Sequence, residues 1–288
     1  MLIDVKKCPE QCETTESLEL WKILKENNGK VGNIRNEVSV ATYLLEFSAQ
    51  NSNIVHVLPA KTGQHVLEIG SSYGNRTKIL ADEGVIVDCI EPDVYKGQVA
   101  SILNKEKNNV NIYAGYTWIE KQFELNDAYD IIYIWDIGAL GVKINSCVLM
   151  ELMKKTNDQG KILMGVDNKY GIKYWNGYRI SQNESFFSTL LGERENALPY
   201  NYITEMLADI DAKVEWYYPF PDMFYTEMVY SDKRMPQCGD IEKMEIPSKV
   251  SVWHNFDENR VMREVVGDDL YRQFANSYLI EIGGDTDG

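Results

Sequence analysis

Short hydrophobic runs alternate with longer segments of helix-like periodicity along most of this chain. The runs at 65–69, 85–90, 110–114, 129–136 and 161–166 each stop at a glycine or an acidic residue, as buried parallel strands often do. Helices are expected between them at 75–83, about 94–107 and 145–156. This alternation predicts an α/β fold with a parallel sheet covered on both faces, whose ligands bind beyond the carboxyl ends of the strands.

The segments outside this alternation predict a lid and a cap. Two amphipathic helices are expected at 14–28 and 34–50, so residues 1–63 are interpreted as an N-terminal helical segment that forms a lid or packs on the sheet edge. Residues 64–288 are expected to form the main domain. A helix at 201–210 and strands at 214–220 and 277–282 complete it, with 224–230 as the alternative last strand. Insertions at about 168–199 and 221–274 have few regular apolar periods and are expected to cap the carboxyl ends of the strands.

The amino-acid composition argues against several classes of function. The 288 residues are 44% hydrophobic and carry 29 Lys and Arg against 44 Asp and Glu, a net charge of −15. An acidic chain without a basic run argues against nucleic acid and anionic membrane surfaces, and no apolar stretch is long enough for membrane insertion. We expect a soluble, cytoplasmic protein. Five cysteines and three dispersed histidines predict no metal site.

Candidate cofactor chemistry lies in residues 64–93. Gly70 and Gly74 bracket a tight turn after the first strand, without the middle glycine that a dinucleotide fingerprint requires. Glu68, at the end of that strand, repels a pyrophosphate but can hold the ammonium of an amino-acid moiety. Glu91 ends the second strand, where the ribose hydroxyls of a nucleoside arrive in such folds. The pattern disfavours a nicotinamide oxidoreductase.

Glu68-x-Gly70-x-x-x-Gly74 followed by Glu91 resembles the first two motifs of the class I S-adenosylmethionine (SAM) dependent methyltransferases, with Ser72 at the family's middle glycine. The resemblance implies a Rossmann-like, seven-stranded class I methyltransferase sheet and an enzyme that uses SAM as its cofactor. It also implies cofactor contacts from Glu68, Gly70, Ser71, Ser72, Gly74, Glu91, Pro92, Gly115, Tyr116 and Asp136.

Motifs later in the chain resemble those of one particular group of methyltransferases. The runs NKYGIKYWNG at 168–177, YYPFPD at 217–222 and FANSY at 274–278 resemble bacterial methyltransferase domains that are associated with glycosyltransferases in surface-polysaccharide gene clusters. This resemblance implies a saccharide or other small acceptor and a glycosyltransferase as partner or fusion. The residues expected to face the acceptor are Asn168, Tyr170, Tyr174 and Trp175.

A hydroxyl acceptor needs a base, and the sequence leaves three alternatives open. Asp136 and Asp167 end the fourth and fifth strands, and His254, in the second insertion, titrates in the right range. Two other functions remain: a catalytically weak SAM-binding scaffold for a glycosyltransferase, and methylation of an amine.

Overall fold

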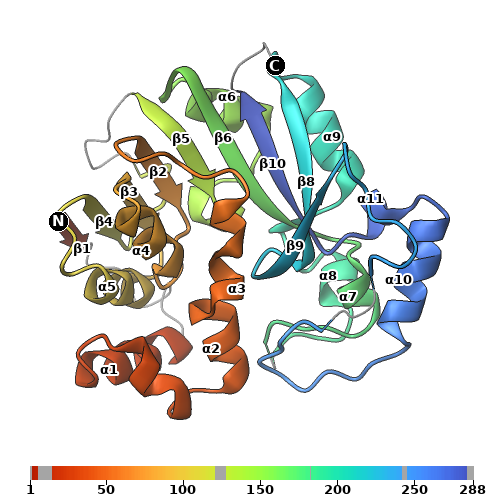
Figure 1. The fold of residues 1–288 in the computed structure, drawn as a ribbon, viewed down its shortest axis with the longest axis horizontal. Coiled ribbons are helices and arrows are strands. Elements are labelled where there is room, and N and C mark those ends of the chain that lie inside the picture. Colours follow the sequence, from red (N-terminus) through yellow and green to blue (C-terminus); the bar gives the residue numbers. More distant parts are fainter. Residues whose placement is uncertain (1, 6–14, 121–127, 182, 242–244, 284–288) are drawn as a thin grey trace.

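The computed structural model describes residues 2–5, 15–120, 128–181, 183–241 and 245–283. One sheet runs through it in the order β1-β4-β3-β2-β5-β6-β10-β8-β9, and β7 pairs with β6 outside this path (Figure 1). The strands are β1 Leu2–Val5, β2 His65–Ile69, β3 Ile86–Glu91, β4 Val110–Ala114, β5 Tyr129–Ile134, β6 Thr156–Asn168, β7 Ala197–Leu198, β8 Val214–Asp222, β9 Tyr225–Ser231 and β10 Ser277–Gly283.

Seven of these strands form the sheet that the sequence predicts. β4, β3, β2, β5 and β6 are parallel, and β10 lies antiparallel between β6 and β8. Leu279 of β10 pairs with Gly165 on one side and Tyr217 on the other. The expected last strand at 277–282 is therefore confirmed, as is the Rossmann-like arrangement of the seven strands.

The sheet also has strands beyond these seven, of which the sequence analysis offered only β9, as the alternative last strand at 224–230. β1 adds a parallel strand beside β4, within the segment expected to be only helical. β9 pairs antiparallel with β8, with Tyr230 opposite Tyr218, and buries Thr226 and Tyr230 while Met228 between them is exposed. The prediction that all of 221–274 caps the sheet is therefore wrong for β9, because its backbone pairs with β8 at the edge of the sheet.

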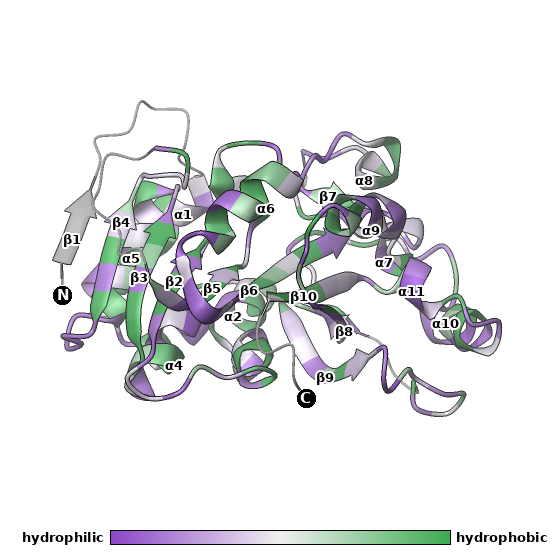
Figure 2. Cartoon of the chain, turned by 90° about the horizontal axis from the view of Figure 1, so that it is seen from above, coloured by the Kyte–Doolittle hydropathy of each residue, from purple (hydrophilic) through white to green (hydrophobic). Residues whose placement is uncertain are grey.

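Helices cover both faces of the sheet (Figure 2). Successive strand residues point to opposite faces, so Leu67 belongs to the same buried cluster as Leu149 and Ile203, whereas Val66 belongs to the cluster that contains Leu80. The helices are α1 Thr15–Glu26, α2 Val40–Phe47, α3 Ala49–Ser52, α4 Asn75–Asp82, α5 Val94–Leu103, α6 Ser146–Met153, α7 Ile172–Trp175, α8 Ser188–Leu191, α9 Tyr200–Ala208, α10 Glu258–Gly267 and α11 Tyr271–Phe274, with 3-10 turns η1 Val31–Asn36, η2 Asn53–His56 and η3 Ile137–Leu140.

The helix expected at 34–50 is broken by two serines. Ser39 begins α2, because its side chain accepts a hydrogen bond from the Thr42 amide at 3.0 Å. Ser48 has extended backbone (ψ 164°) and caps α3 through the Asn51 amide at 3.3 Å. Serine side chains compete in this way for backbone donors, which favours caps over helix interiors.

The N-terminal helices and the cap lie at the same end of the sheet (Figure 1). α1 packs on α5, where the rings of Trp21 and Tyr95 lie 5.4 Å apart. The ring centroids of Phe47, in α2, and Tyr73, in the turn after β2, lie 5.8 Å apart. Among the residues described, no helix combines the length and apolarity needed to cross a bilayer.

Candidate cofactor and acceptor site

A cavity of about 660 Å³ lies at the carboxyl ends of β2, β3, β5 and β6. The N-terminal helices, the cap and the β8–β9 connection supply the rest of its wall. Small-molecule sites usually have volumes of about 300–1,000 Å³. The cavity therefore has the place and the size expected of a ligand site in a parallel sheet.

The turn after β2 forms one wall of this cavity and depends on its glycines. Gly70 has φ +78°, and a Cβ there would lie 2.8 Å from the Asp136 Cβ. Gly74 also has φ +78°, and a Cβ there would lie 2.5 Å from the Ala100 Cβ. Both contacts are too short for any side chain, so the motif glycines fix how closely the turn approaches β5 and α5.

Ser72 takes the position of the middle glycine in a left-handed conformation (φ 54°). Its amide donates a hydrogen bond to Glu91 Oε2 at 2.7 Å, and the Asp93 amide donates to Oε1 at 3.0 Å. Burial raises the pKa of Glu91 to about 8, although Lys96 opposes the shift. The turn and the acid at the end of β3 are therefore one connected unit, and both line the cavity.

Glu68 is fully buried and is not among the residues that line the cavity. Its carboxyl accepts hydrogen bonds from the Thr77 hydroxyl and from the Trp135 indole, the latter at 2.9 Å. Burial raises its pKa. The structure thus places Glu68 beneath the turn, where it links β2 to α4 and to the end of β5.

The other residues expected around the cofactor divide into two groups. Ser71 and Asp136 line the cavity, and Asp136 caps η3 by accepting from the Gly138 amide at 2.8 Å. Gly74 supports the turn from behind it. Pro92, Gly115 and Tyr116 lie at the ends of β3 and β4 outside the cavity wall, with the Gly115 amide bonded to the Glu91 carbonyl at 2.7 Å.

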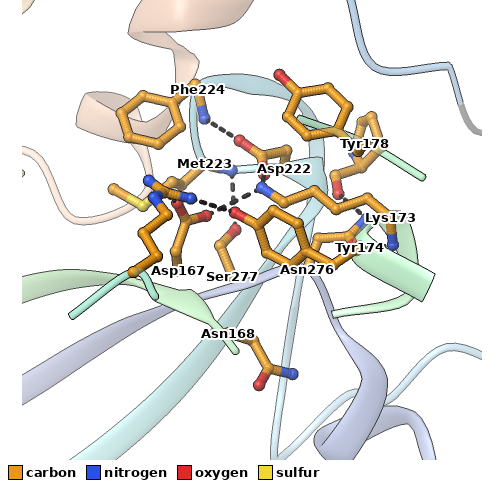
Figure 3. Close-up of polar contacts among 12 residues, drawn as sticks. Asp167, Asn168, Lys173, Tyr174, Tyr178, Asp222, Met223, Phe224, Asn276 and Ser277 are labelled. Carbon is orange, nitrogen blue, oxygen red and sulfur yellow. Dashed lines mark hydrogen bonds and ion pairs between the residues drawn. The ribbon is translucent and has the colours of Figure 1, made fainter. Parts of the chain in front are cut away.

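Asp167 lines the far end of the cavity inside a buried ionic network (Figure 3). Its two carboxylate oxygens each lie 2.9 Å from a cation, Lys173 Nζ and Arg194 Nη2. Lys173 also pairs with Asp222, so two cations balance two carboxylates. Burial opposes ionisation of Asp167, but Lys173 and Arg194 outweigh it and lower its pKa.

The residues expected to face the acceptor do not line this cavity. Asn168 is fully buried, and its amide donates to the carbonyls of Gln273 and Ala275 at 2.7 Å; in Figure 3 it points away from the ionic network. Tyr174 is buried and accepts a hydrogen bond from Arg194. Tyr170 and Trp175 are 41% and 43% exposed on the cap surface.

His254 lies in a second, smaller cavity of about 240 Å³. Its Nδ1 is 3.1 Å from the Asn176 amide nitrogen, which also donates to Glu258 at 2.9 Å. Tyr178 lies in the walls of both cavities. Of the three alternative bases, Asp136 and Asp167 therefore share the main cavity and His254 does not.

The sequence analysis missed several cavity residues. Arg194, Asn196 and Lys249 come from irregular cap segments, and Glu46 comes from α2. No motif or periodicity marks them, because each reaches the site through contacts between segments distant in sequence.

Comparison with known proteins supports the fold. No protein-family model and no curated protein matches the sequence. A chain of the complex between the Haloferax volcanii Trm112 methyltransferase activator and the putative methyltransferase has a TM-score of 0.51 at 11% identity, over 92% of this chain and 97% of that chain.

Two further solved structures show weaker likeness. Haemonchus contortus phosphoethanolamine N-methyltransferase 2, in complex with SAM, has a TM-score of 0.49 at 16% identity, over 92% of this chain and 60% of that chain. A SAM-dependent methyltransferase from Aquifex aeolicus has a TM-score of 0.43 at 14% identity, over 64% of this chain and 89% of that chain. Together with the strand order, the first similarity shows that this chain has the fold of the class I SAM-dependent methyltransferases.

Proposed function

We propose that this protein is a SAM-dependent methyltransferase that methylates a hydroxyl of a saccharide or another small acceptor. The observation that carries the proposal is the single cavity that joins the motif turn and Glu91 at one end to Asp167 and Arg194 at the other. One cavity of about 660 Å³ thus has room for a cofactor beside an acceptor, as methyl transfer requires.

The residues at the turn fit SAM, which supplies an activated methyl group on a sulfonium. Gly70 has no side chain, so a ligand could approach its backbone closely. A Cβ at this position would collide with Asp136. Glu91 is buried yet lines the cavity, so its carboxyl is placed to accept hydrogen bonds from ribose hydroxyls. Ser71 and Ser72 would flank the methionine end.

Glu68 acts on the cofactor through the turn in this proposal. Its two hydrogen bonds hold the end of β2 against Thr77 and Trp135, and Trp135 itself lines the cavity. The carboxyl therefore orients the groups that would contact SAM, in place of the direct ammonium contact that the motif suggests.

The acceptor end combines polar and apolar groups. Arg194, Asn183 and Asn196 offer hydrogen-bonding side chains, while Met223 and Phe224 supply apolar surface. A sugar ring has polar edges and apolar faces, so such a mixed wall suits it. The motif residues Asn168, Tyr170, Tyr174 and Trp175 would then support the cap rather than contact the acceptor in the main cavity.

Asp136 is the base that this geometry favours. Bound SAM would supply the methyl group to the acceptor oxygen, and the Asp136 carboxylate would accept the proton that the hydroxyl loses. Asp136 lines the cavity beside the turn and takes its hydrogen bonds from the neutral groups of Gly138 and Asn196. Asp167 is a weaker base because two cations lower its pKa, and His254 lies in the second cavity.

Calorimetric titration with SAM, beside NAD, tests the cofactor. We expect SAM to bind and NAD not to bind. Gly70→Ala should abolish binding, because the new methyl group meets Asp136 in a left-handed turn. Gly63→Ala is the matched control, since Gly63 has φ +85° but nothing within 4 Å of a Cβ. Binding of NAD in place of SAM would refute the assignment.

A turnover assay tests the proposed acceptor class. It measures the formation of demethylated cofactor with nucleotide sugars, oligosaccharides, amines and peptides. Turnover with saccharides alone supports the proposal, and turnover with amines or peptides alone refutes it. SAM binding without any turnover would favour the alternative of a scaffold for a glycosyltransferase. The proposed link to glycosyltransferases and polysaccharide synthesis rests on the sequence motifs at 168–177, 217–222 and 274–278.

A further inference from the structure

Lys249 joins three parts of the chain at the edge of the main cavity. It lies in the loop between β9 and α10, and its side chain is only 20% exposed. Its Nζ is 2.9 Å from Glu16 Oε1 on α1 and 2.9 Å from Glu46 Oε1 on α2. All three side chains line the cavity, so this cation ties both N-terminal helices to the cap where they meet over the site.

Glu46 extends the connection to the motif turn. Its second oxygen, Oε2, accepts a hydrogen bond from the Ser72 hydroxyl at 3.1 Å. The Ser72 amide in turn donates to Glu91 at 2.7 Å. A continuous path of polar contacts therefore runs from Lys249 in the cap to the proposed ribose-binding acid.

The contacts between Lys249 and the two glutamates are ionic at neutral pH. Burial disfavours charge on Glu46, but Lys249 and Lys96 outweigh it and lower the pKa of Glu46. Burial likewise disfavours charge on Lys249, but Glu46 and Glu16 raise its pKa above the ordinary value. The side chains of Lys249 and Glu46 are 20% and 17% exposed, so solvent screens this pair less than a pair on an exposed surface, whereas Glu16 is 47% exposed and its contact should be weaker.

The backbone of Ser72 shows why the turn needs such support. Ser72 is a non-glycine residue at φ 54°, a left-handed conformation that is strained for any residue with a Cβ. The hydroxyl contact with Glu46 gives the serine a hydrogen bond that glycine could not make. The departure from the family's glycine thus couples the turn to the N-terminal helices.

We propose that Lys249 is a positioning residue for the cofactor: through Glu16 and Glu46 it holds the N-terminal helices and the cap together over the cavity, and through Glu46 it holds the Ser72 turn. This proposal rests on the proposed function.

The test measures the dissociation rate of SAM and of S-adenosylhomocysteine from the full-length protein by stopped-flow fluorescence. Lys249→Met should speed dissociation by about tenfold, on the order of the loss of one partly buried ionic contact. Lys249→Arg should restore slow dissociation, since a guanidinium can also bridge two carboxylates. Glu46→Gln should resemble Lys249→Met, and the double variant should add little to either.

Lys233→Met is the matched control. Lys233 also lies 2.8 Å from a glutamate, Glu215, but its side chain is 78% exposed and it does not line the cavity. The control should leave dissociation unchanged.

The outcomes separate this proposal from the proposed function. If the wild type binds neither SAM nor its product, the proposed function fails and this inference fails with it. If the wild type binds but folded Lys249→Met and Glu46→Gln both dissociate at the wild-type rate, only the positioning role is refuted. A loss of thermal stability without faster dissociation would show a merely structural ion pair and would also refute it. If Lys249→Met does not fold, Glu46→Gln alone decides.

Discussion

Replacing Lys173 by methionine should destabilise the protein strongly. Lys173 Nζ pairs with Asp167 and with Asp222, and the side chains of all three are at most 5% exposed. Burial lowers the pKa of Lys173, but Asp167 and Asp222 outweigh it and raise the value well above normal. Methionine has a similar length but no charge, so the substitution removes the cation without opening a large cavity.

The size of this loss in the free energy of unfolding follows from the charges that remain after the substitution. Arg194 still neutralises Asp167 at 2.9 Å, so the uncompensated charge falls on Asp222. Removing one partner of a buried ion pair costs about 3–5 kcal/mol, and burial of the network leaves little solvent to reduce it. An unfolding entropy of about 2.1 cal/mol/K per residue over 288 residues converts this cost to a fall in melting temperature of roughly 5–8 °C. Urea denaturation followed by tryptophan fluorescence would measure the change in the free energy of unfolding.

Two further variants decide whether the charge network is the cause. Lys173→Met/Asp222→Asn removes both members of the pair and should recover about 2 kcal/mol or more relative to Lys173→Met. Lys233→Met, at an exposed Lys–Glu contact, should leave the urea midpoint unchanged. A cost below about 1 kcal/mol for Lys173→Met, or a double variant no more stable than the single one, would refute the reasoning.

Three other expectations concern the cofactor, the base and acid stability. Glu91→Ala should weaken SAM binding by about 1–3 kcal/mol. Wild-type affinity should rise as pH increases through about 8, because ribose hydroxyls donate to the ionised carboxylate, whose pKa burial raises; calorimetry across this range checks both. Asp136→Asn should lower kcat at least about 100-fold, whereas His254→Gln should leave it nearly unchanged. Burial opposes ionisation of Asp88, but hydrogen bonds from His65 and from Tyr129 help to lower its pKa. Its contribution to stability is therefore present above the unfolded pKa and lost as pH falls through the folded one. Asp88→Asn should cost about 1–3 kcal/mol at neutral pH, and the difference from wild type should shrink in acid-denaturation experiments.

The strands of the fold could be predicted because their signal is local. Runs such as 65–69 and 161–166 are apolar and end where the chain turns, so burial on both faces can be read directly from the sequence. The broken helix at 34–50 shows the limit. Its apolar spacing fits one helix, but Ser39 and Ser48 stop it through side-chain hydrogen bonds that spacing does not reveal.

The site was predictable where its residues lie at the carboxyl ends of the parallel strands. Gly70 follows β2 and Glu91 ends β3, so both reach the cavity. Glu68 has the motif's spacing, but the alternation of β2 turns its side chain beneath the turn. Arg194 and Lys249 were missed because their partners are 27 and more than 200 residues away. The local spacing of residues in the sequence does not reveal contacts between positions so far apart.

The charge of the whole chain is a poor guide to the charge of the cavity. The chain carries −15, which on its own would suit a cationic acceptor. The charged side chains that line the cavity are nearly balanced: Glu16, Glu46, Glu91, Asp136 and Asp167 against Arg76, Lys96, Arg194 and Lys249. Because burial raises the pKa of Glu91 to about 8, much of that carboxyl is neutral at physiological pH, which leaves four carboxylates facing four cations. A balanced wall gives a cationic acceptor no net attraction, so the acidity of the whole chain is no argument against the hydroxyl acceptor that we propose.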